Sequence, residues 1–153
     1  MRRRGIVALV VAAYVLALPA GVSATRYSNV TWFLNWIPSG FPATELCGQS
    51  GIVDTARNYN QALSKVWNYG ACGASRVLPA TFLGSAVYGY RDGNYCGNSG
   101  YYYSTVATAG WQLWATMCSN PAGSQSFHTV GTSLGKAGSG YLAGSVTSPA
   151  QSY

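Results

Sequence analysis

Few side chains of this 153-residue sequence could carry out acid–base catalysis. Proton transfer near neutral pH needs groups such as histidine and carboxylate, and beyond the N-terminal leader the sequence offers only His128, Glu45, Asp54 and Asp92. A glycosidase needs two carboxylates flanking the scissile bond, whereas Asp54 is explained as a helix cap and Asp92 as a turn residue. We therefore assign no catalytic residue. A small secreted hydrolase or toxin centred on His128 is kept as an alternative.

Aromatic side chains, in contrast, are abundant, and binding needs no titratable group. The sequence has five tryptophans and twelve tyrosines, and six of the tyrosines lie in the stretch YGYRDGNYCGNSGYYYS at 88–104. Tyrosine and tryptophan supply stiff contact area with a polar tip, which is why they are frequent in binding surfaces. Many aromatic residues of a small domain simply form its core. The direction in which each ring points therefore decides its role.

The dipeptide Asp92-Gly93 predicts a two-residue hairpin turn, because a type I′ turn needs positive φ at both positions. This turn fixes a register in which Arg91 is opposite Asn94, Tyr90 opposite Tyr95, and Gly89 opposite Cys96. Alternation along the strands then predicts an exposed aromatic face with Arg91 and Asp92 at its tip. Tyr101 and Tyr103 are predicted to be partly buried on the other face, which they share with Cys96. The predicted ligand-binding residues are Tyr88, Tyr90, Arg91, Asp92, Tyr95 and Tyr102.

The elements that must position these residues follow a leader sequence. Residues 1–24 begin with Arg2, Arg3 and Arg4, continue through an apolar run at 6–18 and end in small residues at positions that a signal peptidase reads. The apolar run is shorter than the roughly 20 residues of a membrane-spanning helix. We therefore predict a secretory signal peptide at 1–24 and a single secreted, extracellular domain at 25–153, with no stable membrane insertion after cleavage.

The charge of the predicted mature chain argues against nucleic-acid binding. The whole sequence has a formal net charge of +6, and loss of the three leader arginines leaves six basic and three acidic residues, a net charge of +3. A nucleic-acid site needs clustered cations that neutralise several phosphates at once. The six remaining basic residues are scattered singly: Arg26, Arg57, Lys65, Arg76, Arg91 and Lys136.

The four cysteines, Cys47, Cys72, Cys96 and Cys118, predict two disulfides, because an even number in an exported chain of this size is typical of a disulfide framework. Their spacings contain no C-x-x-C pair, and the sequence has one histidine, so no metal site and no cofactor is predicted. Sequence order favours Cys47 with Cys72 and Cys96 with Cys118 over the other two pairings.

The segment at 25–46 is apolar and aromatic but is interrupted by Pro38, Gly40 and Pro42. The preferred interpretation is a short strand and a loop that pack on the domain's own core. The alternative is docking onto the sheet edge of a partner chain. The predicted partner-binding residues in that case are Trp32, Phe33 and Trp36, and the protein would be a structural or adaptor subunit of an extracellular assembly.

One helix is predicted near 53–68, because apolar residues from Ile52 to Trp67 recur three or four positions apart, Asp54 can cap the first turn and Gly70 can end the helix. After Cys72, runs of β-branched and aromatic residues predict strands near 75–83, 85–91, 94–97, 101–109, 111–118, 125–134 and 141–147. Alternation within 111–118 places four side chains toward the core: Trp111, Leu113, Ala115 and Met117.

The sequence therefore predicts an α+β fold, a small disulfide-bonded domain with one helix on a mainly antiparallel β-sheet. The predicted function is a secreted, non-enzymatic binding or interaction module with an exposed Tyr/Trp surface. Its predicted ligand is a cell-envelope glycan or a partner protein. An inhibitor of secreted proteases also fits the size and the disulfides.

Overall fold

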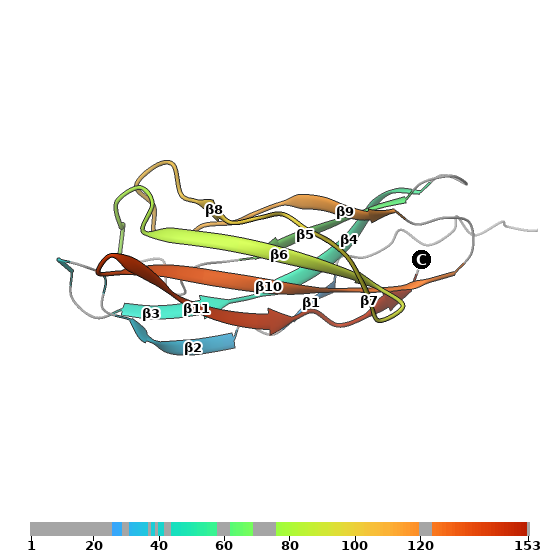
Figure 1. Ribbon diagram of the computed structural model, residues 1–153, viewed down its shortest axis with the longest axis horizontal. Coiled ribbons are helices and arrows are strands. Elements are labelled where there is room, and N and C mark those ends of the chain that lie inside the picture. Colours follow the sequence, from blue (N-terminus) through green and yellow to red (C-terminus); the bar gives the residue numbers. More distant parts are fainter. Residues whose placement is uncertain are drawn as a thin grey trace, which may run out of the picture.

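The computed structural model describes residues 26–28, 31–36, 38, 40–41, 44–57, 62–68, 76–119 and 124–152. The predicted signal peptide at 1–24 and the predicted disulfide partner Cys72 lie outside these residues. The regular elements of the described part are all β-strands, which run along the length of an elongated molecule (Figure 1). The described part contains no helix that is long and apolar enough to cross a membrane.

One layer of the molecule is a four-stranded antiparallel sheet. It contains β1 (Arg26–Tyr27), β4 (Ser50–Arg57), β5 (Ala62–Asn68) and β9 (Ala115–Ser119), in the order β1-β4-β5-β9. A hairpin of β2 (Thr31–Trp36) and β3 (Thr44–Gly48) adjoins this sheet, because only Gln49 separates β3 from β4. The four-stranded sheet and the hairpin together cover one side of the core.

The other layer is a six-stranded sheet. Its main path is β11 (Gly140–Thr147), β10 (Ser126–Ala137), β6 (Leu83–Arg91) and β7 (Asn94–Asn98). Two short strands complete it, since β8 (Tyr102–Tyr103) pairs with β6 and β12 (Gln151–Ser152) pairs with β10. All of these pairings are antiparallel.

The predicted helix near 53–68 is wrong, and with it the α+β fold class. These residues contribute to two strands of one sheet, in which Ile52 pairs with Val66 and Asp54 with Ser64. Strand β4 also pairs with β1, and β5 also pairs with β9, so ladder hydrogen bonds form on both sides of each strand. The three-to-four-residue spacing of apolar residues was compatible with a helix, but this non-local pairing outweighs such a local pattern.

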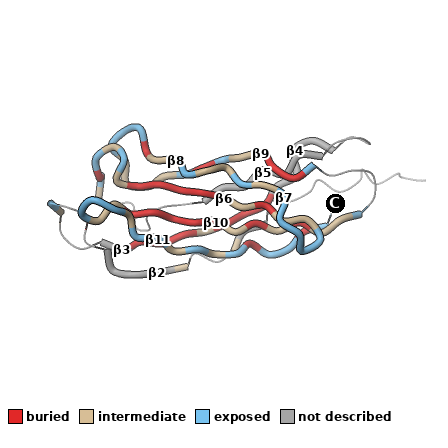
Figure 2. Tube along the Cα trace, in the orientation of Figure 1, coloured by how far each residue is buried: buried red, intermediate tan, exposed pale blue. Residues whose placement is uncertain are grey.

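The core lies between the two sheets. Figure 2 shows the buried residues running along β6 and β10, the central strands of the six-stranded sheet. The larger apolar cluster contains Ile52, Val87, Leu113, Met117, Cys118 and Phe127, and the smaller contains Leu46, Leu78 and Leu83. A buried hydrogen bond of 2.8 Å also joins the hydroxyls of Ser50 and Thr129 across the layers.

The strand predictions succeed best in the six-stranded sheet. Strands β6, β7, β10 and β11 fall on the predicted segments 85–91, 94–97, 125–134 and 141–147. The predictions at 75–83 and 101–109 are largely wrong. Apart from Leu83 in β6 and the two residues of β8, the described residues of these segments are irregular and are joined by one bridge between Leu78 and Thr108. In 111–118, Leu113 and Met117 are buried as expected, while regular pairing begins only at Ala115.

The disulfide between Cys96 and Cys118 confirms one predicted pairing. Its Cα atoms are 5.4 Å apart, and it joins β7 of the six-stranded sheet to β9 of the four-stranded sheet. Cys47 is also disulfide-bonded. The two sheets are therefore linked covalently at the β7–β9 edge of the sandwich.

Candidate aromatic binding face

The predicted turn at Asp92-Gly93 is present. The φ angles are 50° at Asp92 and 79° at Gly93, and the first two pairs are the expected ones, Arg91 with Asn94 and Tyr90 with Tyr95. The turn is fixed to the start of β10, because the backbone N–H of Ser126 donates to the Asp92 carboxylate at 2.8 Å and the Asp92 N–H donates to the Ser126 carbonyl at 2.7 Å.

A register shift follows these two pairs. Gly89 pairs with Gly97 rather than with Cys96, so Cys96 is the additional residue of a β-bulge. Cys96 is exposed, although its sulfur is bonded to that of the buried Cys118. The bulge lets the cysteine reach Cys118 at the edge of the sandwich.

Alternation along β6 separates its residues into two faces. Leu83, Val87 and Gly89 face the four-stranded sheet, since the first two belong to the core clusters and a Cβ on Gly89 would lie 2.6 Å from the Cys118 sulfur. The intervening residues therefore occupy the outer face of the six-stranded sheet. They are Gly84, Ala86, Tyr88 and Tyr90.

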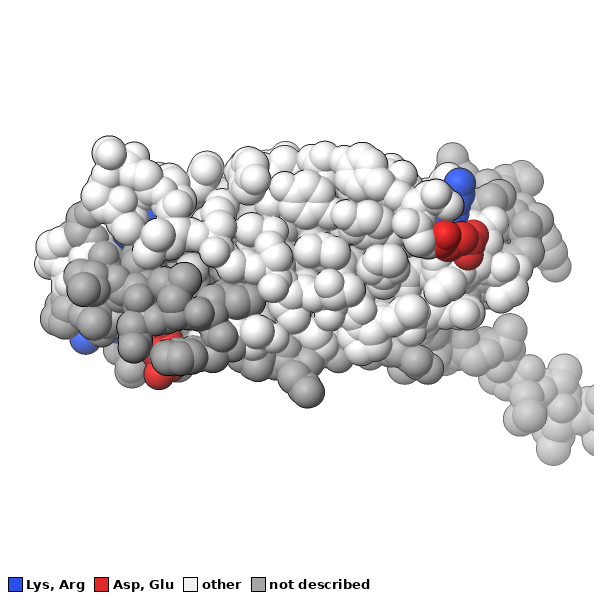
Figure 3. Space-filling model, turned by 60° about the horizontal axis from the view of Figure 1, so that its bottom comes forward, with Lys and Arg blue, Asp and Glu red and all other residues white. Residues whose placement is uncertain are grey.

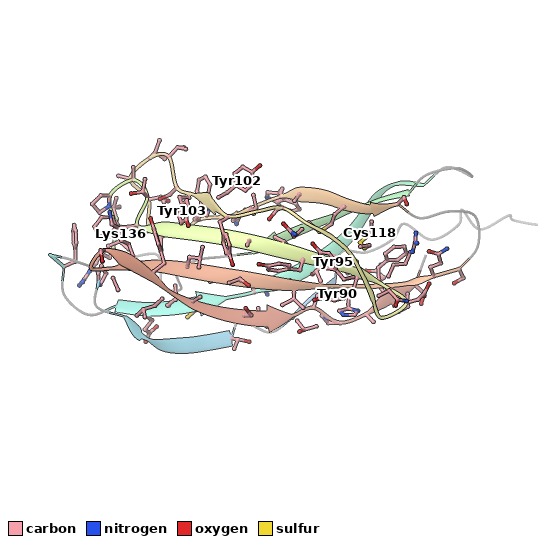
Figure 4. The ribbon with its side chains drawn as sticks, in the orientation of Figure 1. Tyr90, Tyr95, Tyr102, Tyr103, Cys118 and Lys136 are labelled. Atoms are coloured by element: carbon pink, nitrogen blue, oxygen red, sulfur yellow. A yellow bond between two sulfur atoms is a disulfide. The ribbon has the colours of Figure 1, made fainter. Side chains whose placement is uncertain are left out.

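Three aromatic side chains form a cluster on this outer face, which we call the histidine platform: Tyr90, Tyr95 and His128. The rings of Tyr90 and His128 are stacked, with centroids 4.8 Å apart and planes at 3°. Tyr95 meets the edge of Tyr90 at 5.9 Å and 68°, and the Asn98 side-chain amide donates a hydrogen bond to the Tyr95 hydroxyl. Tyr95 is 54% exposed, and Tyr90 and His128 are half-buried. Figure 4 shows the side chains of Tyr90 and Tyr95 near each other.

Tyr88 and Tyr101 form a second contact beside the platform. The Tyr88 hydroxyl donates to the Tyr101 hydroxyl at 3.3 Å, and this hydrogen bond together with burial raises the pKa of Tyr88 to about 12. Tyr101 is 57% exposed, so the expectation that it would be partly buried is wrong. Its hydroxyl contact with Tyr88 brings it toward the outer face.

Tyr102 is exposed and Tyr103 is half-buried, as expected, but the faces on which they lie are the reverse of those expected. Strand β8 pairs with β6, placing Tyr103 beside Gly84 and Tyr102 beside Ser85. Residues paired across two strands share a face, so Tyr103 lies on the outer face and Tyr102 on the side of Ser85. Tyr103 is half-buried and contacts Tyr141, with ring centroids 4.7 Å apart.

The remaining predicted site residues have contacts within the fold. The Arg91 guanidinium donates to the Ser119 carbonyl at 2.8 Å, and Asp92 accepts from Ser126 as described above. The predicted partner segment forms β2, whose backbone pairs with β3 of the same chain. The side chains of Trp32, Phe33 and Trp36 lie outside the part that the structure describes, so their role as partner-binding residues stays a prediction.

The sequence Gly131-Thr132-Ser133-Leu134-Gly135 has the spacing of a G-x-S-x-G nucleophile elbow. Such an elbow needs a sharp turn from a strand into a helix, whereas these residues lie within the extended strand β10. Ser133 is fully buried. His128 and Ser133 also lie on opposite faces of β10, so they do not form a catalytic pair.

Charged groups are sparse on the described surface. In the view of Figure 3 they lie toward the two ends of the molecule, and the surface between them is uncharged. The described residues contain no group of three or more His, Cys, Asp or Glu side chains that could hold a metal ion. Comparison of the chain with protein-family models, curated proteins and solved structures finds no match.

Proposed function

We propose that the protein is a secreted, non-enzymatic binding module that holds an extracellular glycan on the outer face of its six-stranded sheet. The observation that carries this proposal is the histidine platform, in which Tyr90 stacks on His128 and meets Tyr95 edge to face. Aromatic rings have an electron-rich face. The C–H groups on the apolar side of a sugar ring are attracted to that face.

The internal contacts of the platform support binding. Tyr90 is held by His128 and Tyr95, and Asn98 is hydrogen-bonded to the Tyr95 hydroxyl. Rings that are already fixed lose little conformational freedom when a ligand binds, so more of the contact energy contributes to affinity. The hydroxyls of Tyr90 and Tyr95 can also exchange hydrogen bonds with a sugar.

The distribution of charge favours a neutral ligand. The outward-facing residues of β6 are Gly84, Ala86, Tyr88 and Tyr90, none of which is charged. Arg91 and Asp92 lie at the tip of the hairpin and contact Ser119 and Ser126. An anionic polymer would need several cations that face it together.

The proposal can be tested with the exported chain and insoluble glycans. We expect it to co-sediment with cell-wall material, chitin or cellulose, and the double variant Tyr90→Ala/Tyr95→Ala to lose at least tenfold in affinity. Tyr102→Ala is a matched control, because Tyr102 is 54% exposed, like Tyr95, but is paired beside the inward-facing Ser85. Circular dichroism checks that each variant is folded.

Two outcomes would contradict the proposal. One is a folded double variant that binds as tightly as the natural protein. The other is that the chain binds no glycan but captures a partner protein, and that this capture is lost when residues 25–40 are deleted. That result would favour a subunit of an extracellular assembly.

A further inference from the structure

The outer face of the six-stranded sheet carries a second aromatic cluster, which we call the tyrosine pair: Tyr103 and Tyr141. Tyr103 is paired with Gly84, six residues before Tyr90 on the same strand. At about 3.4 Å per residue in an antiparallel strand, this separation is roughly 20 Å. Figure 4 shows Tyr103 and Tyr90 toward opposite ends of β6.

The tyrosine pair is built into the surface. A Cβ on Gly84 would lie 2.7 Å from the Tyr103 ring, so the absence of a side chain there lets the ring lie directly on the strand. Tyr141 donates its hydroxyl proton to the Thr81 carbonyl at 2.7 Å. Both rings are half-buried, so each is held in place while part of it faces solvent.

Between the two clusters, the outer face contains Ala86 and Tyr88 of β6 and, opposite them, Thr132 and Val130 of β10. Ala86 is buried between Gly84 and Tyr88 on the outer face, and on the neighbouring strands Thr132 and Ser145 share a hydrogen bond of 2.7 Å. Ser145 is exposed, as is Ala143 on the same strand. No charged side chain lies on the described outer face of β6 between the clusters. Lys136 of β10 is opposite Tyr141, at the end of this face, and its ammonium group lies 5.3 Å from the centre of the Phe82 ring.

We propose that the histidine platform and the tyrosine pair are the two ends of one extended site, whose ligand is a linear, neutral, ribbon-like glycan that lies along β6. This inference rests on the proposed function and adds the class of glycan. A β-1,4-linked chain is straight and presents flat ring faces, so one such chain can reach both clusters. A branched or compact sugar contacts only one.

Two contacts on one chain give a specific dependence of affinity on ligand length. Once a ligand is bound at one cluster, contact with the second is intramolecular and costs little additional entropy. Affinity therefore rises steeply when the oligosaccharide is long enough to span roughly 20 Å and changes little beyond that length.

The test is calorimetric titration of the exported chain with chito-oligosaccharides and cello-oligosaccharides, from the monosaccharide to the hexasaccharide. We expect at least a tenfold rise in affinity with length, followed by a plateau, in one or both series. Binding in the chito series alone identifies an N-acetylated chain, and binding in both identifies recognition through the ring faces. Tyr103→Ala should weaken binding of the longest oligomers severalfold and leave the shortest unchanged, whereas Tyr102→Ala should change neither.

The failures of the two proposals are distinguishable. Binding that is independent of length in both series would overturn the extended site and leave a single glycan-binding platform. Absence of binding to every oligosaccharide and to the insoluble polymers would contradict the proposed function itself. Because the length series uses the natural chain, it decides the question even if Tyr103→Ala does not fold.

Discussion

His128 and Tyr90 are directly opposite each other on β10 and β6, and their rings are parallel with centroids 4.8 Å apart. Opposite residues of an antiparallel pair project from the same face of the sheet. The only histidine of the sequence is therefore part of an aromatic surface.

The stack predicts the effect of two substitutions at His128. His128→Ala should weaken glycan binding by about threefold to tenfold, since an aromatic pair of this kind contributes roughly 0.5–1.5 kcal/mol. His128→Phe keeps a flat ring beside Tyr90 and should bind within about twofold of the natural chain. Calorimetric titration with the tightest-binding oligosaccharide measures both, and equal losses in the two variants would mean that the imidazole nitrogens, not stacking, matter.

Gly89 and Gly97 are paired across β6 and β7 but should respond differently to alanine. A Cβ on Gly89 would lie 2.6 Å from the Cys118 sulfur and 2.8 Å from the Met117 side chain, whereas one on Gly97 meets only Met117, at 3.7 Å. Gly89→Ala should therefore lower the free energy of unfolding by about 1–3 kcal/mol through overpacking, and Gly97→Ala by less than about 0.5 kcal/mol. Urea unfolding compares them, and equal midpoints would refute the assigned close approach.

Thr81 has a φ of 69°, in a turn where the Phe82 N–H donates to the Pro79 carbonyl. This left-handed conformation costs a β-branched residue about 1–2 kcal/mol, while glycine loses about 0.5–1 kcal/mol more in chain entropy on folding. Thr81→Gly should thus raise the free energy of unfolding by up to about 1 kcal/mol. Ala80→Gly, one residue earlier in the same turn, should lower it. If thermal unfolding showed Thr81→Gly to be less stable than Ala80→Gly, the result would contradict the backbone strain assigned to Thr81.

The hydrogen bond from Tyr88 to Tyr101 predicts an alkaline transition. The pKa of Tyr88 is about 12 in the folded chain, above the value near 10 of an unfolded chain, so the folded state retains this proton longer. The corresponding stability is complete below about pH 10 and is lost as the pH rises through 12. Tyr101→Phe removes the acceptor and should lower the pKa of Tyr88, shifting the last step of the ultraviolet tyrosinate titration. Tyr102→Phe should leave that step in place, and an unshifted step in Tyr101→Phe would contradict the assignment.

The hairpin could be predicted because its turn depends on neighbouring residues. Features that depend on pairing between residues far apart in the sequence could not be predicted. Asp92-Gly93 defines its own turn, and so the contact of Tyr90 with Tyr95 followed from the sequence. The bulge at Cys96 depends on where Cys118 lies, and the face of Tyr103 depends on β8 pairing with β6 instead of β7. The helix prediction failed for the same reason, because the partners of β4 and β5 are set by the whole sheet.

The covalent link between β7 and β9 affects how the molecule resists force. Strand β7 is at the edge of its sheet, and tension applied there could peel it from β6 one pair at a time. The Cys96–Cys118 disulfide ties that edge to the opposite layer, so a pull on β7 is shared by both sheets, which must slide past each other together. If the protein were bound to a polymer under tension beside this edge, the disulfide would resist the separation of β7 from β6. Once the disulfide was broken, β7 could separate from β6 one residue pair at a time.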